Sequence, residues 1–274
     1  MKFIDFEKPG MPDVLYVSET DVPLINEKQI LIKVKAAGIN RPDIIQREGN
    51  YPPPPGHSKI LGLEVSGTVE KIGKNIKKFK LGEKVAALVN GGGYAEYCVA
   101  DEELAFHFPG NLSFNEAACI PECFFTAWSN LVDRGDIKNK KKILIHGGTS
   151  GIGLAAIQIC NLFKSEVFST VGSDEKKQFL KKLNVKHSIN YKKEDFFEEI
   201  KTNFGGVDLI LDFIGGDYIK KNINLLNNDG RLINIGFQKG SITELNLIKI
   251  MLKRLIITGS TLRIRDNKFK AKVS

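Results

Sequence analysis

The stretch Lys142-Ile-Leu-Ile-His-Gly-Gly-Thr-Ser-Gly-Ile-Gly153 decides the fold of this chain. It begins with an apolar run typical of a β-strand and ends in four glycines within seven residues, after which Leu154–Cys160 reads as a helix of small and apolar residues. A strand, a glycine turn and a helix in this order form a diphosphate cradle, because the helix N-terminus presents unpaired N–H groups to an anion. The stretch therefore predicts a nucleotide-binding domain.

Each glycine of this turn has an expected task. Gly147 and Gly148 permit the tight turn, Gly151 lets the main chain approach the phosphates, and Gly153 lets the helix pack close to the sheet. Ser150 belongs to the same turn and is expected to line the cofactor. The turn begins far from the N-terminus, so a whole domain is expected to precede the nucleotide fold.

Composition and charge narrow the class of protein. The 274 residues suffice for two domains, and 42% hydrophobic with 26% charged residues is ordinary for a globular protein. No apolar run is long enough to span a bilayer, the N-terminus does not read as a signal peptide, and the four cysteines form no Cys-x-x-Cys pair, so we expect a cytoplasmic protein without membrane contact. The net charge of +8 comes from lysine runs without interleaved aromatic residues, so no nucleic-acid partner is expected.

The two parts of the chain have different patterns. Gln29–Lys35, Ser66–Ile72 and Glu83–Val89 alternate as half-buried strands do, and Ser113 with Glu116 forms a capping box that opens a helix. From residue 142 onward, strands and helices alternate, which is typical of a doubly wound parallel sheet in an α/β protein. The strands expected there are Ile143–Ile145, Glu166–Val171, Val207–Asp212 and Gly230–Gly236.

A set of segments spread over nearly the whole chain resembles one known family, and it includes Asn40–Tyr51, Ile60–Gly67, Gly91–Glu96, Asn190–Phe196, Asp208–Gly216 and Arg263–Phe269. With these segments, the chain is similar to the medium-chain dehydrogenase/reductase superfamily, and within it to the zinc-free quinone oxidoreductases related to zeta-crystallin. The resemblance implies a GroES-like β-rich catalytic domain over residues 1–113, a Rossmann-type cofactor domain over 114–261, and the start of a return to the catalytic domain over 262–274.

No metal site is expected. Zinc-containing members of the superfamily carry a ligand His in a Gly-His-Glu motif and a ligand Cys in an earlier segment, whereas this chain reads Gly62-Leu-Glu64 and Gly38-Ile-Asn40 at those places. A catalytic zinc needs about three protein ligands. The sequence does not supply them, so the expected chemistry is metal-independent.

The expected cofactor is NADPH. Enzymes that use NAD usually place Asp or Glu at the end of the second strand of the nucleotide fold, where this chain has the small-residue turn Thr170–Ser173. Asp174 and Glu175 follow, and both fit a role in the first turn of the next helix, complementing its dipole. The resemblance implies that the 2′-phosphate region is contacted by Gly172, Ser173, Lys176 and Tyr191.

The resemblance also implies hydride transfer to a quinone, an enone or a similar electron-poor carbonyl compound, in a homodimer. Tyr51 is the expected polar group at the substrate, Asn40 is expected to orient near the nicotinamide, and Gly215 is expected to lie beside the nicotinamide ribose. From the residues alone, Tyr51 would be a loop anchor and Asn40 a turn residue. A quinone can take its protons from solvent, so the reaction does not demand a strong acid.

Two alternatives compete with this interpretation. The glycine spacing also fits short-chain dehydrogenases, but none of the six tyrosines has a lysine four residues later, as that class requires. The second alternative concerns the C-terminus, because members of the family continue beyond the point that corresponds to Ser274. A truncated, catalytically impaired NADPH-binding homologue, acting as a non-enzymatic or hetero-oligomer subunit, is therefore the competing hypothesis.

Overall fold

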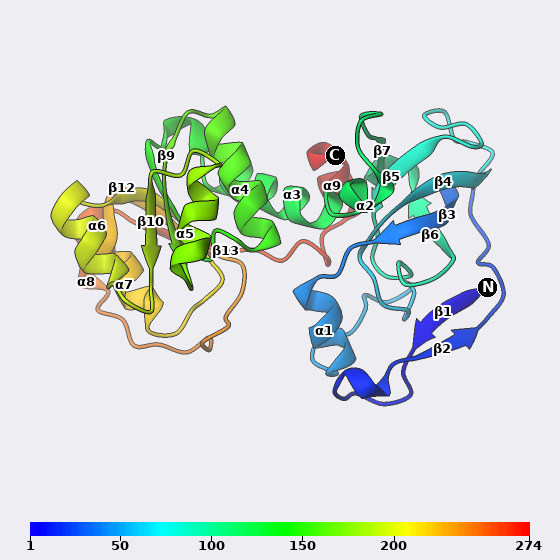
Figure 1. The fold of residues 1–274 in the computed structure, drawn as a ribbon, viewed down its shortest axis with the longest axis horizontal. Helices are drawn as coiled ribbons and strands as arrows, with labels where there is room; N and C mark the ends of the chain where they lie inside the picture. Colours follow the sequence, from blue (N-terminus) through cyan, green and yellow to red (C-terminus); the bar gives the residue numbers. More distant parts are fainter. The chain divides into compact units, whose positions relative to one another are not determined.

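The computed structural model describes residues 1–274 and divides into two compact units, each built on a sheet of its own (Figure 1). The first unit comprises Met1–Phe125 with Leu262–Ser274, and the second comprises Thr126–Thr261. The expected fold class, a β-rich GroES-like part and a Rossmann-type parallel sheet, is confirmed. The expected boundary at residue 113 falls inside the first unit, where Ser66 Oγ donates to the carbonyl oxygen of Phe114 at 2.6 Å.

The first unit is built on a five-stranded antiparallel sheet in the order β6-β3-β4-β5-β7, with β1 and β2 paired separately. Strand β3 was expected to be half-buried, but Leu31 is buried along with Ile30 and Ile32, so both of its faces are covered there. The strands are β1 (Lys2–Asp5), β2 (Tyr16–Glu19), β3 (Gln29–Ala37), β4 (Glu64–Ile72), β5 (Lys84–Leu88), β6 (Tyr97–Asp101) and β7 (Ala105–His107). The α-helices are α1 (Arg41–Arg47), α2 (Phe114–Ala118) and α9 (Asn267–Val273).

The C-terminal segment, residues 262–274, belongs to the first unit through an apolar cluster. Leu262 is buried against Leu88 and Phe125, and Phe269 and Val273 of α9 pack on the same cluster. Polar contacts add to it, because Asn267 Nδ2 donates to Asp101 Oδ2 at 2.6 Å. The core of the first unit is therefore made from two stretches that are far apart in the chain.

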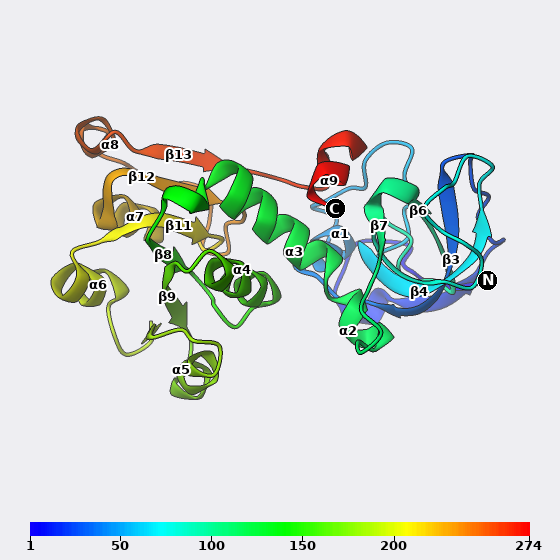
Figure 2. The same cartoon turned by 90° about the horizontal axis from the view of Figure 1, so that it is seen from above.

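The second unit is a six-stranded parallel sheet in the order β10-β9-β8-β11-β12-β13, which leaves β13 at one edge (Figure 2). Its strands are β8 (Lys142–Ile145), β9 (Glu166–Val171), β10 (His187–Asn190), β11 (Val207–Asp212), β12 (Leu226–Asn234) and β13 (Ile256–Gly259). Its α-helices are α4 (Gly151–Leu162), α5 (Asp174–Lys181), α6 (Phe196–Phe204), α7 (Tyr218–Leu225) and α8 (Ile248–Lys253), while α3 (Pro121–Trp128) contains the boundary between the units. No helix is long and apolar enough to cross a membrane.

The strand order determines where a ligand can bind in this unit. From β8 the chain proceeds through β9 and β10 to one edge, and it then returns to the middle and proceeds through β11 and β12 to β13. In such sheets ligands bind at the carboxyl ends of the strands, where the order reverses. That reversal lies between β8 and β11, so the turns that follow these strands are the expected binding edge.

Candidate functional site

The glycine turn lies at the carboxyl end of β8 and has room only for glycine at its tightest points. Gly147 adopts a left-handed conformation with φ of 64°. A Cβ atom at Gly153 would lie 2.4 Å from the carbonyl oxygen of Gly147, so α4 could not approach the turn as closely with any other residue there. The turn and the helix are thus held together as the glycine pattern predicts.

The main-chain amides of this turn fall into two groups. Those of Gly147 and Gly148 face the protein, where they donate to Thr170 Oγ1 at 3.2 Å and to the Thr170 carbonyl oxygen at 3.1 Å. Ser150 begins α4, and its Oγ accepts from the amide of Gly153 at 3.0 Å. The amides without a partner in the protein are those of Thr149, Gly151 and Ile152. Together with the dipole of the twelve-residue helix α4, they can hold an anion.

The residues expected at the far end of the cofactor gather after β9. A Cβ atom at Gly172 would lie 2.9 Å from the hydroxyl oxygen of Tyr191, so that ring lies across the glycine. Ser173 begins α5, and its Oγ accepts from the amide of Lys176 at 3.3 Å. The Lys176 side chain is exposed and forms no ion pair within the chain. This edge therefore offers a free ammonium group, a hydroxyl and a ring to a phosphate.

Asp174 is the acidic residue nearest the end of β9, and its hydrogen-bond partners matter for the choice between NADPH and NADH. It accepts from Asn190 Nδ2 at 2.8 Å and from Lys193 Nζ at 2.6 Å. Those hydrogen bonds, first that of Lys193, lower the pKa of Asp174. Both carboxylate oxygens of Asp174 thus accept hydrogen bonds from neighbouring residues. In this respect Asp174 differs from the acidic residue that holds the ribose in NAD enzymes.

Gly215 lies in the loop after β11, on the other side of the reversal point from β9. Its φ of 71° favours glycine, and its amide donates to Asp212 Oδ1 at 3.3 Å. The second unit thus places the predicted cofactor residues in four turns at one edge of the sheet, after β8, β9, β10 and β11.

In the first unit, Asn40 begins α1 and is held by two carboxylates. Its Nδ2 donates to Glu64 Oε1 at 2.7 Å, and its main-chain amide donates to Asp43 Oδ2 at 2.9 Å. Glu64 also accepts from the amide of Glu122 at 2.8 Å, at the start of α3. The Asn40 side chain is therefore fixed by Glu64.

The carboxyl groups of this cluster are buried together, which favours their protonated forms. Burial raises the pKa of Glu64 to about 7, against the lowering effect of its hydrogen bond with Asn40. Burial, with Glu64 and Asp43 as neighbouring charges, raises the pKa of Glu122 to about 8. Burial also raises the pKa of Asp43, although it accepts from Tyr94 Oη at 3.0 Å.

Tyr51 lies beside a buried arginine of the C-terminal segment. The Arg263 guanidinium carbon is 5.1 Å from the centre of the Tyr51 ring, within the range of a cation–π contact. Arg263 Nη2 donates to Gln46 Oε1 and to the carbonyl oxygen of Asn90, both at 2.8 Å. Burial lowers the pKa of Arg263, and Tyr51 and Asp43 counteract this effect. The structure thus places Tyr51 and Asn40 in one unit, each with its own charged partner.

The sequence alone predicts no role for Asp43, Glu64, Glu122 or Arg263. One signal was present, because Glu64 interrupts the otherwise apolar run Leu61–Val65. A charged residue in such a run is buried with a partner more often than not. Across residues 1–274, no group of three His, Cys, Asp or Glu side chains is placed to hold a metal ion.

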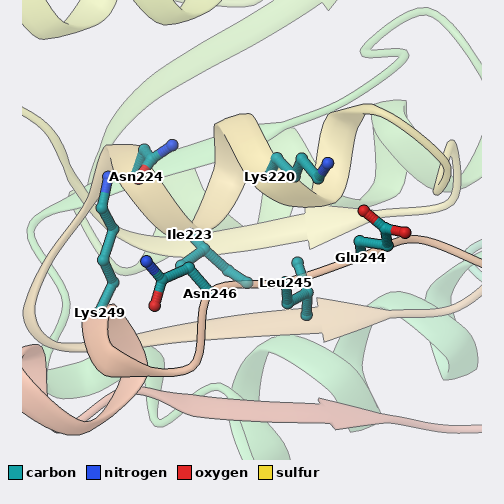
Figure 3. A pocket seen from close by; sticks show the side chains of 7 residues that line it. All are labelled: Lys220, Ile223, Asn224, Glu244, Leu245, Asn246 and Lys249. Atoms are coloured by element: carbon teal, nitrogen blue, oxygen red, sulfur yellow. Dashed lines mark hydrogen bonds between the residues drawn. The ribbon is translucent and has the colours of Figure 1, made fainter.

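A separate cavity of about 400 Å³ lies in the second unit between α7 and the segment that leads into α8 (Figure 3). Lys249 Nζ donates to Asn224 Oδ1 at its wall. None of the predicted cofactor or substrate residues lines this cavity. Its lining residues are Lys220, Ile223, Asn224, Glu244, Leu245, Asn246 and Lys249.

Comparisons with known proteins agree with this organisation. Residues 26–124 match the family model of the alcohol dehydrogenase GroES-like domain, and residues 151–273 match that of the zinc-binding dehydrogenases. The quinone oxidoreductase of Lama guanicoe is 34% identical over 266 residues, which cover 96% of this chain and 80% of that protein.

Two solved structures extend the comparison. Escherichia coli quinone oxidoreductase complexed with NADPH has a TM-score of 0.87 and 30% identity, covering 100% of this chain and 85% of the other. An NAD-dependent alcohol dehydrogenase has a TM-score of 0.87 and 31% identity, covering 96% of this chain and 85% of the other. With its two sheets and its glycine turn, this chain is an oxidoreductase that belongs to the quinone oxidoreductases of the medium-chain dehydrogenase/reductase superfamily.

Proposed function

We propose that the protein is an NADPH-dependent, metal-independent oxidoreductase that reduces quinones or similar electron-poor carbonyl compounds by hydride transfer. The observation that supports it most is the end of β9, where Lys176 is free, Tyr191 lies across Gly172, and Asp174 is engaged by Asn190 and Lys193. A 2′-phosphate gains a charge-assisted contact there, whereas both oxygens of Asp174 are already engaged by other residues.

The residues present fit three parts of this cofactor: its diphosphate, its 2′-phosphate and its nicotinamide ribose. The amides of Thr149, Gly151 and Ile152 would hold the diphosphate, with Ser150 at the same turn. Gly172, Ser173, Lys176 and Tyr191 would hold the 2′-phosphate, and the left-handed Gly215 would let the loop after β11 pass close to the nicotinamide ribose. When bound, NADPH supplies a hydride from its nicotinamide ring.

At the substrate, the chain needs to orient the acceptor and stabilise the oxygen that gains charge. We assign the Tyr51 hydroxyl to that oxygen and assign to Asn40 the orientation of the groups beside the nicotinamide. Arg263 holds the Tyr51 ring, and Glu64 holds the Asn40 amide, so both side chains are fixed before substrate arrives. With these roles, the two side chains are preorganised within the first unit.

The test is oxidation of NADPH by the purified protein with an ortho-quinone, followed by the absorbance of the reduced nicotinamide, with NADH in parallel. We expect turnover with NADPH and a lower kcat/KM with NADH. The variant Lys249→Ala, in the separate cavity, serves as a control that leaves the rates unchanged. Folded protein that binds NADPH without turnover would favour the alternative, a catalytically impaired subunit, and equal use of NADH would refute the assigned cofactor preference.

A further inference from the structure

His146 follows β8 directly, immediately before the glycine turn, and its side chain is fully buried. Its Nε2 lies 2.9 Å from Asn222 Oδ1 on α7, and its Nδ1 lies 3.1 Å from Thr170 Oγ1 on β9. The rings of Phe196 and Tyr218 meet the imidazole edge-on, with centroids 4.9 and 5.0 Å away. The ring is thus enclosed by apolar edges and has one polar partner at each nitrogen.

The partners beyond these two residues determine which way each hydrogen bond runs. At one end, the Gly147 amide can only donate, and it donates to Thr170 Oγ1. At the other end, Asp212 accepts from Asn222 Nδ2 at 3.2 Å and from Asn234 Nδ2 at 3.1 Å, and its second oxygen accepts from the amides of Ile214 and Gly215. With four N–H donors around it, Asp212 acts purely as an acceptor.

With the Gly147 amide at one end and Asp212 at the other, only one set of hydrogen-bond directions is possible for a neutral His146. Asn222 turns its NH2 group to Asp212, so its Oδ1 must accept from Nε2–H of His146. Nδ1 is then the acceptor, and the Thr170 hydroxyl, already accepting from Gly147, donates to it. Burial lowers the pKa of His146, which agrees with an uncharged ring. A proton on Nδ1 would remove the acceptor for the Thr170 hydroxyl.

We propose that His146 is a positioning residue for the cofactor. In its Nε2–H form it joins Thr170 and Asn222 in a hydrogen-bond chain that runs in one direction from the glycine turn to Asp212, and Asp212 also accepts from the amides of the loop that carries Gly215. The inference rests on the proposed function, which assigns the diphosphate to the first of these loops and the nicotinamide ribose to the second. The chain fixes the two loops relative to each other, so that both cofactor contacts form without rearrangement.

The Thr170 hydroxyl offers a clean test, because Thr170→Val removes it and nearly preserves the shape of the side chain, whereas Thr170→Ser retains it. We expect Thr170→Val to raise the Kd for NADPH, measured by fluorescence titration, by about tenfold, which corresponds to about 1.4 kcal/mol. Thr170→Ser should restore most of the affinity. A matched pair of variants separates an effect on loop position from an effect on stability, because Asn222→Ala on α7 and Asn227→Ala on β12 each remove a hydrogen bond to an aspartate of β11, Asp212 and Asp208 respectively. Only Asn222→Ala should weaken NADPH binding.

Nitrogen-15 NMR of the histidine rings tests the same chain in the unmodified protein, without relying on a variant that folds. We expect His146 to be neutral and protonated at Nε2 at pH 7. An imidazolium or an Nδ1–H ring would overturn the inference, and so would unchanged NADPH affinity in Thr170→Val. If the unmodified protein binds no NADPH, the proposed function fails; if it binds NADPH but Thr170→Val binds it equally well, only the inference fails, so the two failures are distinguishable.

Discussion

Replacing Glu64 by Gln tests the buried carboxyl group that holds Asn40. The pKa of Glu64 rises from 4.5 to about 7 because the group is buried. In the unfolded chain it ionises near its ordinary value, so the folded protein binds more protons between pH 4.5 and 7 and its stability falls as the pH rises through this window. At about 1.4 kcal/mol for each pKa unit, the loss reaches about 3 kcal/mol above pH 7.

In Glu64→Gln this side chain cannot ionise. Its NH2 group, however, lies opposite the main-chain amide of Glu122, which in the unmodified protein donates to Glu64 Oε2. An unpaired buried donor costs about 1–3 kcal/mol at every pH. We therefore expect the unfolding free energy of Glu64→Gln to be lower than that of the unmodified protein at pH 5. By pH 8 most of this difference should have disappeared, because the unmodified protein loses stability as Glu64 ionises.

Hydrogen exchange of the amides in β3 and β4, measured over a urea series at each pH, reports the unfolding free energy of the first unit alone. Glu116→Gln is the matched control, because hydrogen bonds with Ser113 lower the pKa of Glu116 rather than raise it. Its effect should not change between pH 5 and 8. A stability difference for Glu64→Gln that is equally independent of pH would refute the argument that burial keeps Glu64 protonated.

Three further predictions concern the cofactor, the substrate and the expected homodimer. Lys176→Ala should raise the Kd for NADPH about tenfold while leaving the Kd for NADH within about twofold, since a charge-assisted hydrogen bond contributes about 1.5–3 kcal/mol before screening by solvent; equal losses for both would contradict a 2′-phosphate contact. Tyr51→Phe should lower kcat/KM with a quinone about tenfold at unchanged NADPH affinity, and stopped-flow turnover that matches the unmodified protein would remove Tyr51 from the reaction. Ile256 is exposed on the edge strand β13, so Ile256→Lys should dissociate a homodimer that pairs along this edge; sedimentation that shows an intact dimer would exclude β13 as its interface.

Much of the fold could be predicted because the signals are local. The predicted strands Glu166–Val171 and Val207–Asp212 match β9 and β11 residue for residue. The capping box is confirmed as well, with the Glu116 amide donating to Ser113 Oγ at 3.2 Å and the Ser113 amide donating to Glu116 Oε2 at 2.8 Å. Apolar periodicity and cap residues act over a few positions, so a single sequence carries them.

The partners of the candidate site residues could not be predicted, because they come from distant parts of the chain. His146 and Asn222 are 76 positions apart, and Arg263 and Gln46 are 217 positions apart. No periodicity or spacing in the sequence predicts such pairs. The first pair meets only when the parallel sheet and its helices have packed, and the second only when the C-terminal segment has packed on the first unit. The glycine turn predicts where an anion binds, but the side chains that fix the turn could be identified only in the structure.

The division of the first unit into Met1–Phe125 and Leu262–Ser274 has a consequence for synthesis of the protein. On the ribosome, the first 125 residues emerge long before Leu262 and Phe269, which complete one of their apolar clusters. The second unit is a single uninterrupted stretch and can fold as soon as it emerges. We expect the second unit to be able to complete its fold before the first, which, although made earlier, finishes only after Leu262–Ser274 has emerged. The order of folding thus inverts the order of synthesis.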